Sequence, residues 1–450
     1  MLSARQCEEG FMLRTMLLLA LGTGAAITMP AQTNTTPTFT RDVAPILQRH
    51  CQTCHRPGEA APFSLLTYEQ ARPWAKAIKY AVLEKKMPPW FADPQFGKFA
   101  NDASLSQSDI HTLVAWVDAG AASGDPKDMP APREFVEGWS IPKPDIIFQL
   151  PKPFPVPATG VMEYQYVIIP TGFTRDTWVQ HVQAAPTNHS VVHHIVAYVR
   201  TPGSNYFKDM PPNEFFEAPP AKTDGSKAPK DDVPNDWLTG YAPGQPPDMF
   251  KPGEAKLIPA GSDIVIEIHY VPEGKATTDQ SRLGLVLAKE PPRMRAMTLS
   301  AGNMTFKIPP GDPNFRVDAS FTMPEDLTLL GLHPHMHMRG KSAQYRIVFD
   351  DGKTETLLNV PRYNWHWQLW YDLVEPIKLP KGTKLECTEH FDNSKNNPEN
   401  PDASKTVSWG QQSFDEMMVC MFNVTFDAAI TTQQMLAPAR SKPVVGEAKQ

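Results

Sequence analysis

The spacing of apolar residues changes along the chain, from a helical period before residue 125 to short β-rich runs after it. Thr40 and Thr67 are each followed by apolar residues three and four positions apart, and we expect both to cap helices. A third helix should begin after Ser106, which has Asp109 in the place of a capping box, and should end at Gly120. The pattern therefore predicts a helical region over residues 38–125.

After the helical region, short runs of β-branched and aromatic residues alternate with turns rich in Gly, Pro and Asn. This spacing is typical of antiparallel sandwiches rather than of alternating strands and helices. The expected strands are residues 145–150, 164–169, 191–199, 264–270, 283–288, 327–332, 344–349 and 418–426. Residues 201–260 are rich in Pro, Gly, Lys and Asp, and we expect them to form a long surface excursion that partly covers a cleft.

Proline content supports this division of the chain. The sequence has 47 prolines, and nine of them fall between Pro126 and Pro157, where a stiff linker is expected.

We expect a small all-α domain followed by two all-β antiparallel, jelly-roll-like sandwiches. The predicted order is a signal peptide (1–31), the all-α domain (36–126), the proline-rich linker (127–144), the two sandwiches (145–292 and 293–430) and a tail (431–450).

Charge and the N-terminus bear on location and partners. A net charge of -6 argues against a nucleic-acid partner, which would need a basic face. Arg14 precedes the apolar stretch 15–29, and small residues follow near Ala31, as in an export signal. We therefore expect a periplasmic or secreted protein, in contact with a membrane only if the signal stays uncleaved. In such an oxidising compartment Cys387 and Cys420 could form a bridge.

Cys51-Gln-Thr-Cys54-His55 is the attachment pattern of a c-type haem, because two thiols one turn apart can bond the vinyl groups while the histidine reaches the iron. A redox or zinc CxxC motif followed by a chance histidine is the alternative. We expect Met87 to be the sixth iron ligand, with His50 and His111 as rivals and a packing role for Met87 as the other possibility.

Three further segments of this region have a family likeness. Cys54–Leu65, Met87–Trp90 and Trp116–Pro126 resemble the cytochrome c domains that are fused to larger enzymes in soil bacteria. Residues 36–126 are therefore expected to be a cytochrome c domain that holds one haem.

Two histidine groups suggest metal sites in the β-rich region. His193 and His194 are adjacent in an expected strand, so both can bind one metal only at a bulge, twist or strand end, and His269 could supply a third nitrogen. His335 and His337 share one face of an extended strand with His333, which precedes a proline and can turn aside. We expect His335 and His337 to be ligands, because a buried imidazole row needs polar partners. A site with imidazole and thioether ligands would select copper over zinc or magnesium.

The chain resembles the type II copper, ascorbate-dependent monooxygenases, the group of peptidylglycine α-hydroxylating monooxygenase and dopamine β-monooxygenase. The likeness spans residues 145–428 and rests on three patterns in the family's order. His193-His194 with the later His269-Tyr270 resembles the electron-transfer copper site, and His335–Gly340 resembles the HTH-x-x-G element at the oxygen-binding copper. Ser413–Met417 resembles the DEM element, whose methionine is a copper ligand. These likenesses imply one copper on His193, His194 and His269, and a second on His335, His337 and Met417.

The resemblance also has departures. The peptide-amidating enzymes have a substrate-binding Arg and Tyr where this chain has His333 and Met421, so a peptidylglycine substrate is not expected. The family's paired cysteines near the second copper are echoed by Cys387 and Cys420. However, Cys420 lies three residues after Met417 rather than one, which leaves the bridge open.

The resemblance implies a copper-dependent monooxygenase that uses O2 to hydroxylate a C–H bond of a small organic substrate. Its electrons would come through the fused haem, from ascorbate or from a periplasmic donor protein. The main alternative is an exported electron-transfer or copper-binding protein without hydroxylase activity. A zinc hydrolase is disfavoured, because Met417 would be a poor zinc ligand.

Overall fold

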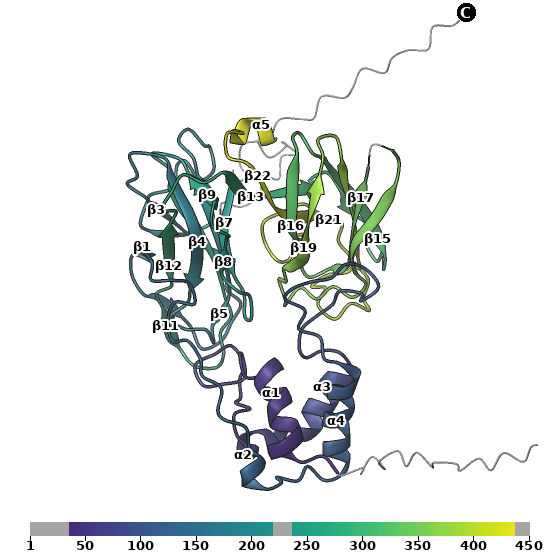
Figure 1. Ribbon diagram of the computed structural model, residues 1–450. Helices are drawn as coiled ribbons and strands as arrows, with labels where there is room; N and C mark the ends of the chain where they lie inside the picture. Colours follow the sequence, from purple (N-terminus) through teal and green to yellow (C-terminus); the bar gives the residue numbers. More distant parts are fainter. Residues whose placement is uncertain (1–35, 219–235, 350, 437–450) are drawn as a thin grey trace, which may run out of the picture. The chain divides into compact units, whose positions relative to one another are not determined.

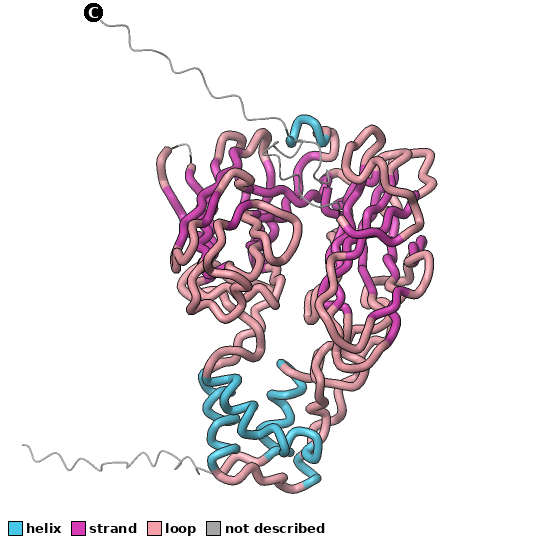
Figure 2. Tube along the Cα trace, turned by 180° about the vertical axis from the view of Figure 1, so that it is seen from behind, coloured by secondary structure: helices cyan, strands magenta, loops and turns pink. Residues whose placement is uncertain are grey.

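The computed structural model describes residues 36–218, 236–349 and 351–436, and the described residues from Pro37 onward fall into one compact unit. Strands make up most of its regular structure, and the helices before residue 120 gather apart from the strands (Figures 1 and 2). The predicted signal peptide (1–31), with Cys7, lies outside the described residues, as do 437–450 of the predicted tail. No helix in the described part of the chain has the length and apolar character needed to cross a membrane.

Residues 39–118 form the expected helices. These are a π-helical turn (Phe39–Val43), α1 (Ala44–His50), α2 (Tyr68–Ala71), a 3-10 turn (Arg72–Trp74), α3 (Ala75–Leu83) and α4 (Gln107–Asp118). Two of the three predicted caps are confirmed, at Thr67, which forms a capping box with Gln70, and at Ser106, which accepts from the Asp109 N–H. The predicted cap at Thr40 is wrong. Thr38 holds that position, and its N–H donates to the Asp42 carboxylate instead.

The helical region is interrupted by a segment that packs elsewhere. Phe99 pairs with Leu373 in a β-bridge and belongs to the core of the strands after residue 293. Asn101 donates from its side-chain amide to the Trp370 carbonyl (2.9 Å). Trp90 contacts Tyr371 at 4.9 Å between ring centroids. The chain between α3 and α4 is therefore built into the second half of the β structure.

The strands before residue 293 form two facing layers around one apolar core. One layer is ordered β6-β3-β10-β5-β7, with bounds Phe215–Glu217, Gln165–Pro170, Asp263–Tyr270, Val192–Arg200 and Asp236–Tyr241. The other contains β1-β12-β4-β9, with bounds Ile146–Gln149, Arg282–Leu287, Thr177–Ala185 and Glu254–Ile258. All five strands expected in this part are confirmed to within a few residues.

The strands after residue 293 form a second pair of layers. One is β13-β22-β16-β19, with bounds Met294–Gly302, Val419–Asp427, Leu327–His335 and Tyr371–Leu379. The other is β15-β20-β17-β18, with bounds Phe315–Thr322, Lys384–Phe391, Gly340–Val348 and Thr354–Val360. A short parallel pairing of β13 with β9 joins one layer of each pair into a nine-stranded sheet. The shorter elements are β2 (Phe154–Val156), β8 (Asp248–Met249), β11 (Thr277–Asp279), β14 (Lys307–Ile308), β21 (Val407–Ser408) and α5 (Thr432–Leu436).

Residues 201–260 are not the surface excursion that their composition predicted. Strands β6, β7 and β9 run through this stretch, and each pairs with neighbours in the sheets. The charged Lys256 is only 1% exposed, because its ammonium donates to the carbonyls of Trp237 and Leu238. Buried polar groups of this kind break the apolar pattern by which a strand is recognised. Residues 219–235 lie outside the described chain.

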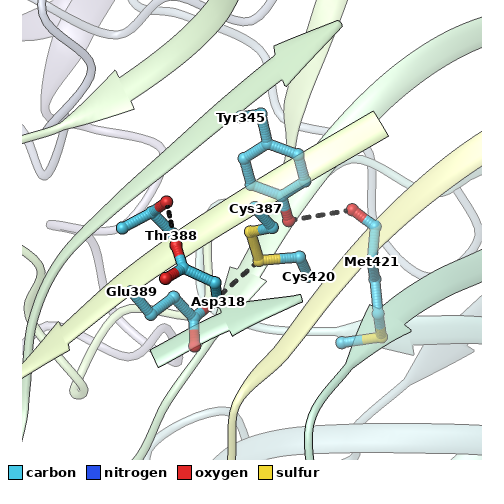
Figure 3. The surroundings of a disulfide bond; sticks show 7 residues. All are labelled: Asp318, Tyr345, Cys387, Thr388, Glu389, Cys420 and Met421. Atoms are coloured by element: carbon cyan, nitrogen blue, oxygen red, sulfur yellow. Dashed lines mark hydrogen bonds between the residues drawn. A yellow bond between two sulfur atoms is a disulfide. The ribbon is translucent and has the colours of Figure 1, made fainter. Parts of the chain in front are cut away.

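A disulfide joins the two layers of the second sandwich. Cys387 on β20 is bonded to Cys420 on β22, with the Cα atoms 6.4 Å apart (Figure 3). Both residues are buried in the core. The neighbouring Glu389 is fully buried, and its carboxyl contacts Sγ of Cys420 at 3.3 Å. Because a disulfide sulfur carries no proton, the protonated Glu389 carboxyl is the donor here.

Replacing Cys387 and Cys420 together with alanine should lower the free energy of unfolding by about 4 kcal/mol, because the bridge no longer restricts the unfolded chain. The 33-residue separation of the two cysteines sets this magnitude. Denaturant unfolding of the variant and of the wild type, with and without thiol reductant, measures the difference. Equal stability of the oxidised wild type and the variant would contradict it.

Burial of Glu389 predicts that stability depends on pH. Burial first, and then the charge of Glu416, raise the pKa of Glu389 well above its ordinary value. The folded state therefore keeps a proton that the unfolded state loses above about pH 4.5, and stability should fall as pH rises, by up to about 1.4 kcal/mol per pH unit. Unfolding measured between about pH 5 and 9 should show a shallower decline for Glu389→Gln.

The matched control is Glu386→Gln on the same strand. The pKa of Glu386 is lowered by its hydrogen bonds with Lys384 and Arg346. Its ionisation therefore raises the free energy of unfolding as pH rises, and this gain is complete near neutral pH. This control should keep the wild-type decline. An identical pH profile for Glu389→Gln and wild type would contradict the assignment.

Candidate metal centres

The first histidine group lies on neighbouring strands of the first sandwich. His194 on β5 is opposite His269 on β10, and Tyr270 is opposite Val192, so His193 is the extra residue of a β-bulge. The irregularity that two adjacent ligands require is therefore present. The ring centroids of the three histidines lie 5.1 to 5.3 Å apart. One ring nitrogen from each lies within 4.8 Å of the others, a spacing that a single metal ion can bridge.

All three rings are neutral in this setting. Burial lowers the pKa of His193 to about 4 and that of His269 to about 2, and it lowers the pKa of His194 well below its ordinary value. Nδ1 of His269 is buried without a hydrogen-bond partner, and Nδ1 of His193 faces Nδ1 of His194 at 3.1 Å. Neutral imidazoles with lone pairs facing one another are the form that binds a metal.

Glu267 is a neighbour of this group that sequence reasoning missed. It precedes His269 by two residues on β10, and its Oε1 lies 3.8 Å from Nε2 of His194. Burial raises the pKa of Glu267, while a hydrogen bond from Tyr166 opposes that rise. Residues two positions apart on a strand point to the same face. The position of Glu267 relative to His269 could therefore have predicted that their side chains are neighbours.

The second histidine group lies at the end of β16. His335 is the last residue of the strand, and His337 follows it in the turn, with the two ring centroids 5.3 Å apart. Nδ1 of His335 is 2.9 Å from Oε1 of Gln368, which can accept its proton and so leave Nε2 free for a metal. His337 is 2% exposed, and neither of its ring nitrogens makes a hydrogen bond of good geometry, although the backbone of Asp415 and Gln412 is close enough to oppose the lowering of its pKa. Burial lowers the pKa of both histidines.

A buried carboxyl holds the turn that follows His335. Glu416 accepts hydrogen bonds from the N–H groups of His337 (2.9 Å) and Arg339 (2.6 Å). Burial raises the pKa of Glu416 to about 8, and these two N–H groups oppose the rise. The Arg339 guanidinium donates to the Phe414 carbonyl (2.8 Å), so segment 413–417 is fixed against the turn. Met417, the expected thioether ligand, is the residue directly after Glu416 and is partly buried.

His333 does not turn aside before Pro334: its ring lies 6.3 Å from the His335 ring and nearly parallel to it, on the same face of the strand. Its Nδ1 is 3.0 Å from the Leu369 carbonyl, and its ring stacks on Trp370 at 4.8 Å between centroids. Trp237 of the first sandwich lies 6.1 Å from the same ring. These contacts make His333 part of an aromatic group between the sandwiches.

Direct contacts connect the surroundings of the two histidine groups. Nε2 of His193 is 2.9 Å from the carbonyl of His366, and the Ser413 hydroxyl lies 3.3 Å from that of Tyr164. His335 is close enough to His194 to lower the pKa of that residue further. The two groups therefore face a shared interior between the sandwiches.

In the predicted haem-attachment motif, Nδ1 of His55 is 3.2 Å from the Phe63 carbonyl. A proton held there leaves Nε2 free to bind a metal. Cys51 and Cys54 are free thiols, and burial raises their pKa values to about 12 and about 11. Several large apolar side chains just before, on and just after α3 are exposed: Trp74, Tyr80, Leu83 and Met87. A flat apolar group such as a porphyrin would cover such a surface.

Other predicted ligands lie outside these groups. The rival haem ligands His50 and His111 lie on α1 and α4, and Met87 lies after α3, where it is 36% exposed. Cys387, Glu389 and Cys420 also lie within metal-binding distance of one another. The cysteines of that set are oxidised to a disulfide, so the set is structural.

Comparison with protein-family models and with curated proteins finds no match. Among solved structures, the infectious bursal disease virus Gt strain structure is 10% identical, with 67% of this chain and 77% of that chain covered and a TM-score of 0.16. The PNGF-II structure is 11% identical, with 62% and 60% covered and a TM-score of 0.21. The Sputnik virophage structure is 8% identical, with 72% and 96% covered and a TM-score of 0.17. These similarities are too weak to support an argument about fold or function.

Proposed function

We propose that this chain is an exported, copper-dependent monooxygenase that hydroxylates a C–H bond of a small organic substrate and receives its electrons through a fused c-type haem. The observation that carries the proposal is His337, a buried imidazole whose ring nitrogens make no hydrogen bond of good geometry, on a turn that Glu416 holds beside the segment ending in Met417. A buried polar group without partners is costly, and a metal ion is a partner that would offset that cost.

The donor sets of the two centres favour copper. In the proposal His193, His194 and His269 hold one ion, and His335, His337 and Met417 hold the other. Neutral imidazole with thioether suits Cu(I) better than zinc or magnesium. Copper bound at the second centre supplies the activation of O2, of which one atom enters the substrate and the other leaves as water.

The protein groups around the copper ligands have positioning roles in this proposal. Gln368 fixes the ring of His335 through Nδ1, and Glu416 fixes the backbone of the turn that carries His337. Burial of both rings keeps the imidazoles neutral and limits the access of water. The side chains therefore orient the ligands and exclude solvent, and none of them has to act as an acid or base.

Residues 36–126 are the cytochrome c domain of this proposal. Its haem would be bound through Cys51, Cys54 and His55, with Met87 as the sixth ligand. The fixed tautomer of His55 and the exposed apolar side chains near α3 support this assignment. The disulfide and the N-terminal apolar stretch support export to the periplasm or beyond, where ascorbate or a donor protein would supply electrons.

An electron-transfer or copper-binding protein without hydroxylase activity is the second candidate. The observation in its favour is that His337 is buried and His335 is half-buried, which limits the access of a substrate to the pair. Copper-dependent O2 consumption in the presence of catalase distinguishes the two. Consumption coupled to a hydroxylated product supports the monooxygenase, and its absence across a substrate panel supports the alternative.

Metal and haem analysis of wild type and Met417→Ala tests the donor sets. Expression with haem-maturation machinery, followed by copper loading, should give two coppers and one haem per wild-type chain. Met417→Ala should fall toward one copper with its haem unchanged, because a thioether donor is lost from only one centre. Met418→Ala is the matched control, since Met418 is fully buried in the sandwich core. Zinc in both centres, or no bound metal, would remove the oxygen chemistry.

A further inference from the structure

We propose that the surface formed by His189, Tyr241 and Gly244 of the first sandwich is the docking face for the haem edge, through which an electron passes to the copper of His193, His194 and His269. This inference rests on the proposed function for the presence of both cofactors. It adds the place where they communicate and the residues that hold that place together.

The haem-attachment motif directly contacts this face. A Cβ built on Gly244 would lie 3.8 Å from Sγ of Cys54, and Gly244 has a φ of +84°, a conformation in which glycine is favoured. This distance is ordinary van der Waals contact, so the backbone at Gly244 lies beside the sulfur that would carry the haem thioether. The edge of a haem bonded to Cys54 would therefore lie against the loop that follows β7.

A polar contact through His189 lies at the same place. Nδ1 of His189 lies 3.3 Å from Oε2 of Glu59, which belongs to the loop after the haem motif. The same nitrogen lies 3.0 Å from the Tyr241 hydroxyl. Burial raises the pKa of Tyr241, and Glu59 and Cys54 add to that rise, so the phenol is close to the haem motif as well. One imidazole thus joins a carboxylate of the helical region to a phenol of the sandwich.

From this face, two short paths lead to the first histidine group. Tyr241 is the last residue of β7 and pairs with Ile195 of β5, the residue next to His194. His189 precedes His193 by four residues, so their Cα atoms are at most about 14 Å apart. Neither path leads through the second histidine group. The geometry therefore assigns the first centre as the electron acceptor.

The step transfers one electron and no atoms. Ferrous haem is oxidised to the ferric state, and Cu(II) at the first centre is reduced to Cu(I). An external one-electron donor then reduces the haem again. Because no proton moves, the rate depends on the separation and contact of the two groups and not on a titrating residue.

Anaerobic rapid mixing tests the docking face on the full chain loaded with haem and copper. Protein with ferric haem and Cu(II) receives less than one equivalent of a fast one-electron reductant, and the haem absorbance then reports the passage of the electron. Wild type should show haem oxidation at a rate independent of protein concentration, with matching loss of the Cu(II) resonance signal. Glu59→Gln and His189→Ala should each slow this phase at least tenfold with unchanged haem and copper content.

The control variant is Asp118→Asn, which breaks the Lys79–Asp118 ion pair inside the helical region and touches no residue of the sandwich. It should keep the wild-type rate. Unchanged rates in Glu59→Gln and His189→Ala, or haem oxidation in wild type that proceeds without copper, would overturn the docking face. A failure of the proposed hydroxylase function would give a different result. Ascorbate would then drive no O2 consumption, while copper-dependent oxidation of the haem would persist.

Discussion

Leucine in place of His337 is expected to stabilise the metal-free protein while removing one of its two coppers and its hydroxylation activity. Both ring nitrogens of His337 are buried without a hydrogen bond of good geometry, and an unsatisfied buried polar group costs about 1–3 kcal/mol. An apolar side chain of similar size has no such cost, so the metal-free variant should gain stability in that range. Copper at a concentration a thousandfold above its dissociation constant stabilises the folded protein by about 4 kcal/mol. The variant should lose this stabilisation at the second centre.

Denaturant unfolding with and without Cu(I), together with copper analysis, checks both halves of this expectation. His390→Leu is the control, because His390 lies on β20, is partly exposed and contacts the Ser342 hydroxyl at 3.2 Å. It should retain two coppers. A metal-free His337→Leu protein that is less stable than wild type, or one that still binds two coppers, would contradict the expectation.

Alanine at both Cys51 and Cys54 is expected to abolish covalent haem and to reduce turnover with a protein electron donor at least a hundredfold. Both cysteines are free thiols, and they are the two that the haem motif offers for thioether bonds. Without haem, a donor protein has no route through the docking face. Ascorbate is small and can reduce the copper directly, so ascorbate-driven turnover should remain.

Haem staining of the denatured chain, the haemochrome spectrum and O2 uptake with each donor measure this effect. Ascorbate-driven uptake also serves as the internal control that the sandwiches and their copper are intact. Equal donor-driven rates with and without haem would show that electrons bypass the helical region. Point substitutions are preferable to deletion of the region, since deletion would also remove Phe99 from the second sandwich core.

The sequence predicted strands best where apolar residues run together. Residues 264–270 and 418–426 are such runs, and both are central strands in the structure. The missed strands β9 and β20 contain buried polar residues, Lys256 and Glu389, whose burial depends on partners far away in the chain. Periodicity along the sequence carries no information about such partners.

The histidine groups show the same limit. Adjacent ligands at His193 and His194 require a bulge, and that local requirement is met in the structure. Gln368 was missed as a support of His335, because it is 33 residues away and no motif links the two. Glu416 lies in the segment that resembles the DEM element, but only the methionine of that segment was given a role. The ligand role of Met417 stays a prediction that the metal analysis tests.

The segment between α3 and α4 affects how this architecture could have arisen. Because Phe99 and Trp90 pack against the second sandwich, the helical region cannot have been added as a self-contained unit without later adjustment of both parts. Removal of a buried phenylalanine from a core costs about 3–5 kcal/mol. A gene that lost its first portion would therefore encode a weakened sandwich, and selection for stability alone would keep the two portions joined.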